Sequence, residues 1–311
     1  MKLDNLNNFK ESLVLYELKS ELDLFLNLYN IKKFPNVLML SGKKGVGKYT
    51  VIKHFLNYVY DKENYDLKNN TISDQTTFYK QFSNNVYPNI IYLSGSNFLK
   101  IKIDDIRNLK SKILKSASLN KERFIILDDI EIFNTSSLNA LLKIIEEPSK
   151  NNYFILINSK TRSLVETITS RALEVRISLT NEMRINIIKS LVKKNNLKVF
   201  IDYKTYNLTP GNFITFNKIC EMNKIDPNNS FTLNLNKLLN LYKKNKDLEL
   251  INMMLYLTNI FFYNLQNKNK DKIEKIMENK DFVIDSINKF ITYNLNQTSL
   301  INAINSKLSN E

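Results

Sequence analysis

The segment from Gly42 to Thr50 contains the residue types that bind a phosphate group. Its sequence is GKKGVGKYT. Glycines let the backbone curl its N–H groups around an anion, and the N-terminus of a following helix adds a favourable dipole. Gly42, Gly47 and Lys48 occupy the fixed places of the pattern G-x-x-x-x-G-K-[ST], and Gly45 supplies a further glycine. The segment therefore predicts a loop that binds the phosphates of a nucleotide such as ATP.

One position of this loop departs from the pattern. Tyr49 stands where a serine or threonine hydroxyl normally holds a magnesium ion. The hydroxyl of Thr50 comes one residue later, about 100° further round a helix, and should point elsewhere. We keep Thr50 as a candidate nucleotide contact, and we expect nucleotide binding more readily than efficient magnesium-dependent hydrolysis. A glycine-rich turn without a ligand is the alternative interpretation.

Two acidic residues, Asp128 and Asp129, follow the apolar run Phe124–Leu127. A carboxylate at the end of such a strand can hold a magnesium ion, and the next acid usually polarises the attacking water. We therefore predict that Asp128 binds magnesium if a nucleotide binds. Asp129 is one methylene shorter than the usual glutamate, and a misplacement of about 1 Å can cost about a hundredfold in rate. A pair of acids that only caps a helix is the alternative.

Five short apolar runs are typical of buried parallel strands, and helical segments separate most of them. The runs are Val37–Leu40, Ile90–Leu93, Phe124–Leu127, Tyr153–Ile157 and Leu173–Ile177. The helical segments between and before them are Lys10–Asn30, Thr50–Tyr60, Asp104–Lys115 and Ser136–Glu146. This alternation predicts an α/β fold, with a five-stranded parallel sheet and helices on both of its faces.

The remaining segments contain no clear strand signal. Residues 61–88 are polar, and we expect a long loop or a weak pair of helices there. Residues 181 to about 225 are helical and basic in pattern, and Pro210-Gly211 indicates a turn within them. Residues 226–229 resemble a linker. Helical patterns follow it at Leu233–Lys243, Asp247–Gln266, Lys272–Glu278, Phe282–Tyr293 and Ser299–Leu308.

The composition excludes several classes of site. One cysteine, Cys220, and one histidine, His54, exclude an intramolecular disulfide and make a zinc centre untenable. No segment is apolar over the length that a membrane helix needs, and the N-terminal residues lack the apolar core of a signal peptide. We therefore expect a cytoplasmic protein that does not bind a membrane.

The charge distribution does not by itself predict a nucleic-acid surface. The formal net charge is +14, and clustered cations gain free energy by displacing counterions from phosphates. However, the chain is rich in lysine, asparagine, isoleucine, phenylalanine and tyrosine, whose codons are rich in A and T. Many lysines can therefore be ordinary solvated surface. The six arginines differ, because all of them lie between Arg107 and Arg184.

Several segments resemble the clamp-loader branch of the AAA+ family, and most closely the delta-prime type of bacterial DNA polymerase III. The resemblance covers roughly residues 10–180. The segments that carry it are Phe34–Gly42, Ile103–Arg107, Asn139–Pro148 and Leu164–Arg171. It implies an AAA+ domain over about 1–180, a helical lid over 181–228 and a helical collar for oligomerisation over 229–311. Nothing here corresponds to the four-cysteine zinc module that many family members carry.

The resemblance also implies roles for three residues. Ser170 and Arg171 match the pair that places an arginine finger in the ATP site of the adjacent subunit, and Asn158 matches the polar sensor residue. A guanidinium suits the first role, because it presents several fixed donors to charge on phosphoryl oxygens. Ala172 replaces the cysteine that usually follows the arginine. A surface arginine in an ordinary ion pair is the alternative for Arg171.

These expectations combine into one interpretation with two rivals. The main one is a stator subunit that supports ATP hydrolysis in its neighbour while a sliding clamp is loaded onto primed DNA, with delta and gamma/tau type subunits as partners. Its own ATPase activity would be weak or absent. The first rival is an active gamma/tau-like ATPase, which Lys48 and Asp128 would permit. The second is a non-enzymatic scaffold that no longer binds nucleotide.

Overall fold

The computed structural model describes residues 12–95, 106, 108, 109, 111, 113, 122–146 and 151–309. The chain forms two compact units. The first contains the residues up to Ser190 together with Thr209–Asn212, and the second contains Leu191–Leu208 and Phe213–Glu311. The division into a lid and a collar at residue 228 stays a prediction.

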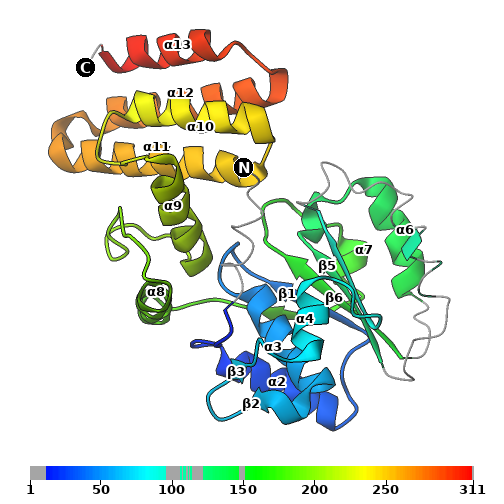
Figure 1. Ribbon diagram of the computed structural model, residues 1–311. Coiled ribbons are helices and arrows are strands. Elements are labelled where there is room, and N and C mark those ends of the chain that lie inside the picture. The colour runs from blue at the N-terminus through cyan, green and yellow to red at the C-terminus, as the bar shows by residue number, and fades with distance from the viewer. Residues whose placement is uncertain are drawn as a thin grey trace. The chain divides into compact units, whose positions relative to one another are not determined.

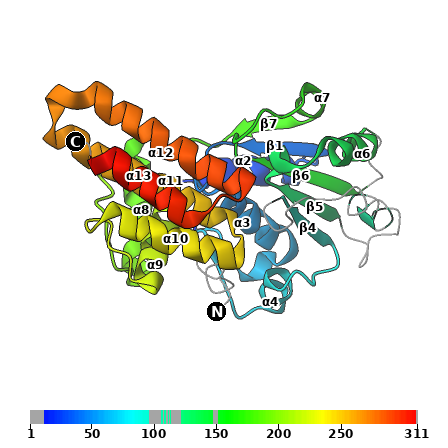
Figure 2. The ribbon, with the colours of Figure 1, turned by 90° about the horizontal axis from the view of Figure 1, so that it is seen from above.

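The first unit is built on a five-stranded parallel sheet, which confirms the predicted α/β fold. Its strands are β1 (Val37–Ser41), β4 (Ile90–Ser94), β5 (Arg123–Asp128), β6 (Asn152–Asn158) and β7 (Leu173–Arg176). Their order across the sheet is β4-β5-β6-β1-β7, which Figure 2 shows from β7 at the top to β4 at the bottom. The carboxyl ends of β5, β6 and β1 therefore lie at one edge of the sheet.

Helices cover both faces of this sheet (Figure 1). One face is covered by α2 (Lys19–Asn30), α3 (Lys48–Tyr60) and α4 (Thr77–Ser83), and the other by α6 (Thr135–Ile145) and α7 (Glu166–Thr169). Successive strand residues point to opposite faces: Leu38 and Leu40 enter the first core, whereas Val37 and Met39 enter the second. This explains why the central strands are apolar throughout rather than alternating.

Two predicted segments differ in the structure. The first helix begins at Lys19, not at Lys10, and Val14 instead forms an antiparallel bridge with Thr71. Of the two alternatives for residues 61–88, the structure has the weak pair of helices, η1 (Lys62–Asn64) and α4, and not the long loop. It also has an antiparallel hairpin that was not predicted. The hairpin strands are β2 (Tyr65–Asp66) and β3 (Thr71–Ile72). The predicted helix Asp104–Lys115 lies largely outside the described residues.

Strand β7 is mostly exposed, so the prediction of a buried strand was wrong at this position. Leu173 is 50% exposed, and Glu174 and Arg176 are exposed as well. The reason is that β7 is an edge strand, paired only with β1.

The chain after β7 is helical, as predicted. Its helices are α8 (Asn181–Asn195), α9 (Pro210–Asn223), α10 (Phe231–Asn245), α11 (Leu248–Lys268), the short η4 (Lys270–Lys272), α12 (Ile273–Tyr293) and α13 (Gln297–Ser309). The two helices predicted on either side of residue 280 are one helix, because Ile276, Val283, Ile287 and Phe290 form one buried stripe. Within the described ranges, no helix combines the length and the apolar character needed to cross a bilayer.

Pro210-Gly211 begins helix α9 and is not a turn inside a helical region. Proline is favoured in a first helical turn, because its missing N–H would have no partner there. Residues 209–212 belong to the first unit and contact the loop after β1. The Gly211 N–H donates to the Gly45 carbonyl at 2.8 Å, and the Thr209 hydroxyl donates to the Lys44 carbonyl at 2.7 Å. Asn212 donates to the same Lys44 oxygen at 3.3 Å.

We expect Gly211→Ala to destabilise this contact. A Cβ atom at Gly211 would lie 2.8 Å from the Gly45 Cα atom, which is backbone and cannot move aside easily. Overpacking of this kind costs about 1–3 kcal/mol, which exceeds the gain of about 1 kcal/mol in helix propensity. The measurements are chemical denaturation and exchange of the residue 211 amide, which donates to the Gly45 carbonyl.

The exposed residue Glu221 of the same helix offers a matched control. Glu221→Ala should change the free energy of unfolding by no more than about 0.5 kcal/mol. A Gly211→Ala protein that is more stable than the wild type, with unchanged exchange of the residue 211 amide, would contradict the close packing.

Candidate functional site

The loop between β1 and α3 has the backbone shape that the glycine pattern predicts. Gly45 and Gly47 have φ angles of 82° and 105°, a region that residues with a Cβ rarely adopt. Helix α3 starts directly after Gly47. In the described part of the chain, the N–H groups of Val46 and Gly47 make no hydrogen bond with protein. The loop can therefore offer N–H groups and a helix N-terminus to an anion.

Lys48 is buried at the base of this loop, with an exposed fraction of 5%. Its Nζ donates to the carbonyl oxygens of Gly42 at 2.7 Å and Lys43 at 3.0 Å, and to the Ser159 hydroxyl at 3.3 Å. Burial lowers the pKa of Lys48 to about 8, although the carboxylates of Asp128 and Asp129 oppose the shift. The ammonium group is thus held inside the loop by the loop's own carbonyls.

Ser159 connects the lysine to two acids. Its hydroxyl donates to Asp129 Oδ1 at 3.2 Å, and its N–H donates to Glu131 Oε1 at 3.1 Å. The same Glu131 oxygen accepts from the Thr161 hydroxyl at 2.9 Å. Asp129 and Glu131 are both 5% exposed. Asp129 therefore faces Ser159 at the end of β6, and its backbone is in the left-handed region with φ at 51°.

Both oxygens of the Asp128 carboxylate accept hydrogen bonds. Its Oδ2 accepts from the Tyr92 hydroxyl at 2.8 Å, and its Oδ1 accepts from the Asp129 N–H at 2.9 Å. Burial, and next the Asp129 carboxylate, raise the pKa of Asp128 to about 6. The ring of Tyr49 packs edge-on against Tyr92, with centroids 5.4 Å apart. Tyr49 therefore packs against the tyrosine that is hydrogen-bonded to Asp128.

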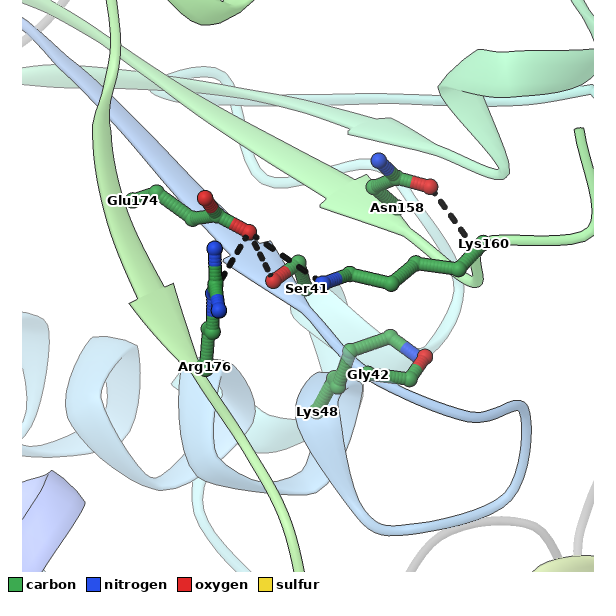
Figure 3. A network of polar contacts seen from close by, with 7 residues as sticks. All are labelled: Ser41, Gly42, Lys48, Asn158, Lys160, Glu174 and Arg176. Carbon is green, nitrogen blue, oxygen red and sulfur yellow. Dashed lines mark hydrogen bonds and ion pairs between the residues drawn. The ribbon is translucent and has the colours of Figure 1, made fainter. Parts of the chain in front are cut away.

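A second network joins the ends of β1 and β7 (Figure 3). The Glu174 carboxylate accepts a short hydrogen bond from Ser41, the residue before the loop. It also forms ion pairs with Lys160 and Arg176, each at 3.5 Å. The hydrogen bond from Ser41, and next the Arg176 charge, hold the pKa of Glu174 below its usual value. The edge strand is thereby tied to the start of the loop.

Asn158 lies directly against the loop. Its carbonyl accepts from the Gly42 N–H at 3.1 Å, and its side-chain Oδ1 accepts from the Lys160 N–H at 2.8 Å. The side chain is 7% exposed, so its position is well defined by neighbours. Thr50 is half-buried in the first turn of α3, one residue beyond Tyr49.

Arg171 lies on the surface, just after α7. Its Nη1 donates to the Thr167 carbonyl at 2.8 Å and to the Ser170 hydroxyl at 3.5 Å. Its Nη2 forms an ion pair with Glu146 at 2.9 Å, in which the side chains are 39% and 44% exposed. Within the described residues, these contacts use α7 and the end of α6, and none uses the phosphate loop.

The structure brings most of the predicted residues together around the loop and leaves Ser170 and Arg171 apart from them. Contacts join the loop with Asn158, Asp128 and Asp129, partly through side chains that the sequence analysis did not single out. These are Ser41, Tyr92, Glu131, Ser159, Lys160, Glu174 and Thr209. Ser159 could have been found, since it directly follows Asn158 at the end of a strand. Nothing in the sequence marks Tyr92 as a functional residue, because it lies in the middle of an apolar run.

Comparison with known proteins identifies the family. Residues 18–181, more than half of the chain, match the family described as DNA polymerase III, delta subunit. The chain is 27% identical over 173 residues to DNA polymerase III subunit delta' from Buchnera aphidicola subsp. Schizaphis graminum, covering 55% of this chain and 52% of the relative. It is 26% identical over 186 residues to subunit gamma of the same organism, covering 57% and 50%. The chain spans about half the length of these two relatives.

Solved structures give weaker likenesses. A gamma subunit-related protein from Thermotoga maritima shares 17% identity at a TM-score of 0.48, over 90% of this chain and 96% of that one. The RuvB Holliday junction branch migration motor of the same organism shares 15% identity at a TM-score of 0.44, over 95% of this chain and 85% of that one.

The family match over residues 18–181 includes the phosphate loop, the acids Asp128 and Asp129, and the Ser170-Arg171 pair. The chain therefore belongs to the delta-prime and gamma family of DNA polymerase III clamp-loader subunits, within the AAA+ proteins.

Proposed function

We propose that this chain is a delta-prime-type stator of a clamp loader, which supplies Arg171 to the ATP site of a neighbouring subunit. Its partners are delta and gamma/tau type subunits, and the complex loads a sliding clamp onto primed DNA. The observation that carries the proposal is the exposed guanidinium of Arg171 in a chain whose own nucleotide loop is altered at Tyr49.

Arg171 can leave its present contacts at little cost. Its ion pair with Glu146 is about 40% exposed on both sides, and such solvent-exposed pairs contribute about 0–1 kcal/mol. A guanidinium has five N–H donors, and within the described residues its Nε makes no hydrogen bond. A partner's phosphoryl oxygens could accept two of these N–H groups at once, because arginine–phosphate pairs are frequently bidentate.

The chain's own site supports weak hydrolysis at most. Asp129, the candidate catalytic acid, is bonded to Ser159 at 3.2 Å and is 5% exposed. A general base needs to reach the attacking water within about 3 Å. The shorter side chain and this contact both hold the carboxylate back from such a position.

An active gamma/tau-like ATPase is the second candidate. Gamma subunits are among the relatives that this chain resembles, and the loop keeps Gly42, Gly47 and Lys48. Steady ATP turnover by the isolated chain, abolished by Lys48→Met, would favour this candidate over the stator.

We expect Arg171→Ala to lower ATP turnover at the neighbouring subunit of a reconstituted loader by about a thousandfold or more, as for other arginine fingers. Assembly should be unchanged, because the side chain is exposed and contributes little to folding. The measurements are clamp-stimulated phosphate release and size-exclusion chromatography of the complex.

Arg162→Ala is the matched control, since Arg162 is an exposed arginine in the same connection between β6 and β7. It should leave turnover within about twofold of the wild type, as expected for a surface substitution. Unchanged turnover with Arg171→Ala would reject the finger assignment.

We also expect the affinity of the isolated chain for ADP to fall as the pH rises through 8. Phosphates bind the protonated ammonium, and burial lowers the pKa of Lys48 to about 8. The protonated fraction then drops about tenfold between about pH 7 and about pH 9, and the affinity should follow it. Isothermal titration over this range measures the effect.

Lys48→Met should bind ADP weakly and with no pH dependence across the same range. A wild-type affinity that does not change with pH would contradict a role for this ammonium. Undetectable binding at millimolar nucleotide would instead assign the loop a purely structural role, as in the scaffold alternative.

A further inference from the structure

The position of the missing metal-binding hydroxyl is occupied by an aromatic pair. Tyr49 follows Lys48 in the first turn of α3, and its ring meets that of Tyr92 on β4 at 5.4 Å with an interplanar angle of 64°. Edge-to-face pairs of this kind are attractive beyond the burial of their area. The pair is therefore a stable arrangement, not a loose surface contact.

The second tyrosine of the pair also engages the acid that would hold the metal. Tyr92 donates its hydroxyl to Asp128 Oδ2 at 2.8 Å, while Asp128 Oδ1 accepts from the Asp129 N–H at 2.9 Å. Hydrogen bonds to a charged group are stronger than those between neutral groups. A magnesium ion demands oxygen ligands in near-ideal octahedral geometry, so the Tyr92 hydroxyl competes with it for Asp128 Oδ2.

Neighbouring acids do not supply a replacement ligand set. The Asp129 carboxylate accepts from Ser159, and Glu131 is bonded to the Ser159 N–H and to Thr161. Within the described ranges, no group of three or more histidine, cysteine, aspartate or glutamate side chains is placed to hold a metal ion. Acidic side chains in that part of the chain therefore form no alternative cluster for the metal.

The loop itself carries positive charge that can take over part of the metal's role. Lys43 and Lys44 lie in the loop and Lys48 at its base. Cationic side chains neutralise phosphate oxygens directly, so a polyphosphate in this loop does not depend on a divalent ion for its charge balance.

We propose that Tyr49 and Tyr92 together exclude divalent metal from the phosphate loop of this chain. Tyr49 removes the hydroxyl ligand and holds the Tyr92 ring in place, and Tyr92 occupies the carboxylate of Asp128. The loop consequently binds phosphate groups through its backbone N–H groups and lysines alone. This inference concerns the isolated chain and does not rest on the role of Arg171.

The test is the affinity of the isolated chain for ADP in excess MgCl2 and in excess EDTA, measured for the wild type and for Tyr49→Thr/Tyr92→Phe. The double substitution restores a hydroxyl at the altered place and frees one Asp128 oxygen. We expect the wild type to show no more than about a twofold difference between the two conditions. The double variant should bind at least about tenfold more tightly with magnesium, a difference of about 1.4 kcal/mol.

Tyr58→Phe is the matched control, because Tyr58 lies on the same helix and its hydroxyl makes no hydrogen bond within the described residues. It should behave as the wild type, and thermal unfolding must show that each variant is folded. Tyr92→Phe alone provides a second, smaller change if the double variant is unstable, and it should show a smaller gain in magnesium dependence.

Each result decides the proposal. Metal-independent binding by the wild type, beside a magnesium-dependent double variant, supports it. A wild type that binds no ADP in either condition overturns it, because the loop then does not bind phosphate groups through its N–H groups and lysines. Magnesium-dependent binding by the wild type overturns it. A folded double variant and a folded Tyr92→Phe that both show no effect of magnesium also overturn it. The Arg171→Ala experiment measures turnover in a neighbouring subunit, so failure of either idea is recognised separately.

Discussion

The pairing of β1 between β6 and β7 is the constraint on which the rest of the site depends. Parallel pairing aligns Ser41 with Asn158 on one side and with Arg176 on the other. Because all strands run in one direction, the loop after β1 leaves the sheet where the neighbouring strands also end. Side chains from distant parts of the sequence therefore reach the loop without any special bend of the chain. The two covered faces of the sheet keep this register in place, because a slip of one residue would turn the side chains of each core toward the opposite face.

The buried ammonium of Lys48 is the electrostatic centre of this edge. Removing a charge from water is costly unless partners replace the lost hydration. Two loop carbonyls and the Ser159 hydroxyl are those partners, and Ser159 in turn engages Asp129 and Glu131. The loop is thus closed by its own lysine from inside, while residues 209–212 hold the carbonyls of Lys44 and Gly45 from outside.

The altered loop and the exposed arginine differ in how far contacts within the chain satisfy their polar groups. In the loop, aromatic packing and a phenol hydrogen bond use groups that would otherwise face a metal ion. At Arg171, the contacts that the described residues make with the guanidinium are solvent-exposed. Interactions inside the chain therefore satisfy the first site, whereas the second remains able to bind a partner. That contrast is what a subunit that assists its neighbour would need.

The sequence by itself determined the elements and the family. Apolar runs of strand length predicted all five strands to within two residues at each end, because continuous hydrophobicity is what a doubly covered sheet requires. The spacing of Gly42, Gly47 and Lys48 predicted the loop, since few residue types allow its backbone angles. Local sequence was less informative where long-range pairing overrode it. Val14 joins a hairpin strand instead of a helix, and Pro210 starts a helix instead of a turn.

Only the tertiary structure decided which side chains meet at the loop. Tyr92 reads as one more apolar strand residue, yet the pairing of β4 with β5 brings it to Asp128. Glu174 and Ser41 are 133 residues apart and meet because β7 adds to the edge of β1. The exposure of β7 likewise follows from its place in the strand order, which no local pattern encodes. Periodicity reports how one segment is buried, whereas contacts between segments depend on the register of the whole sheet.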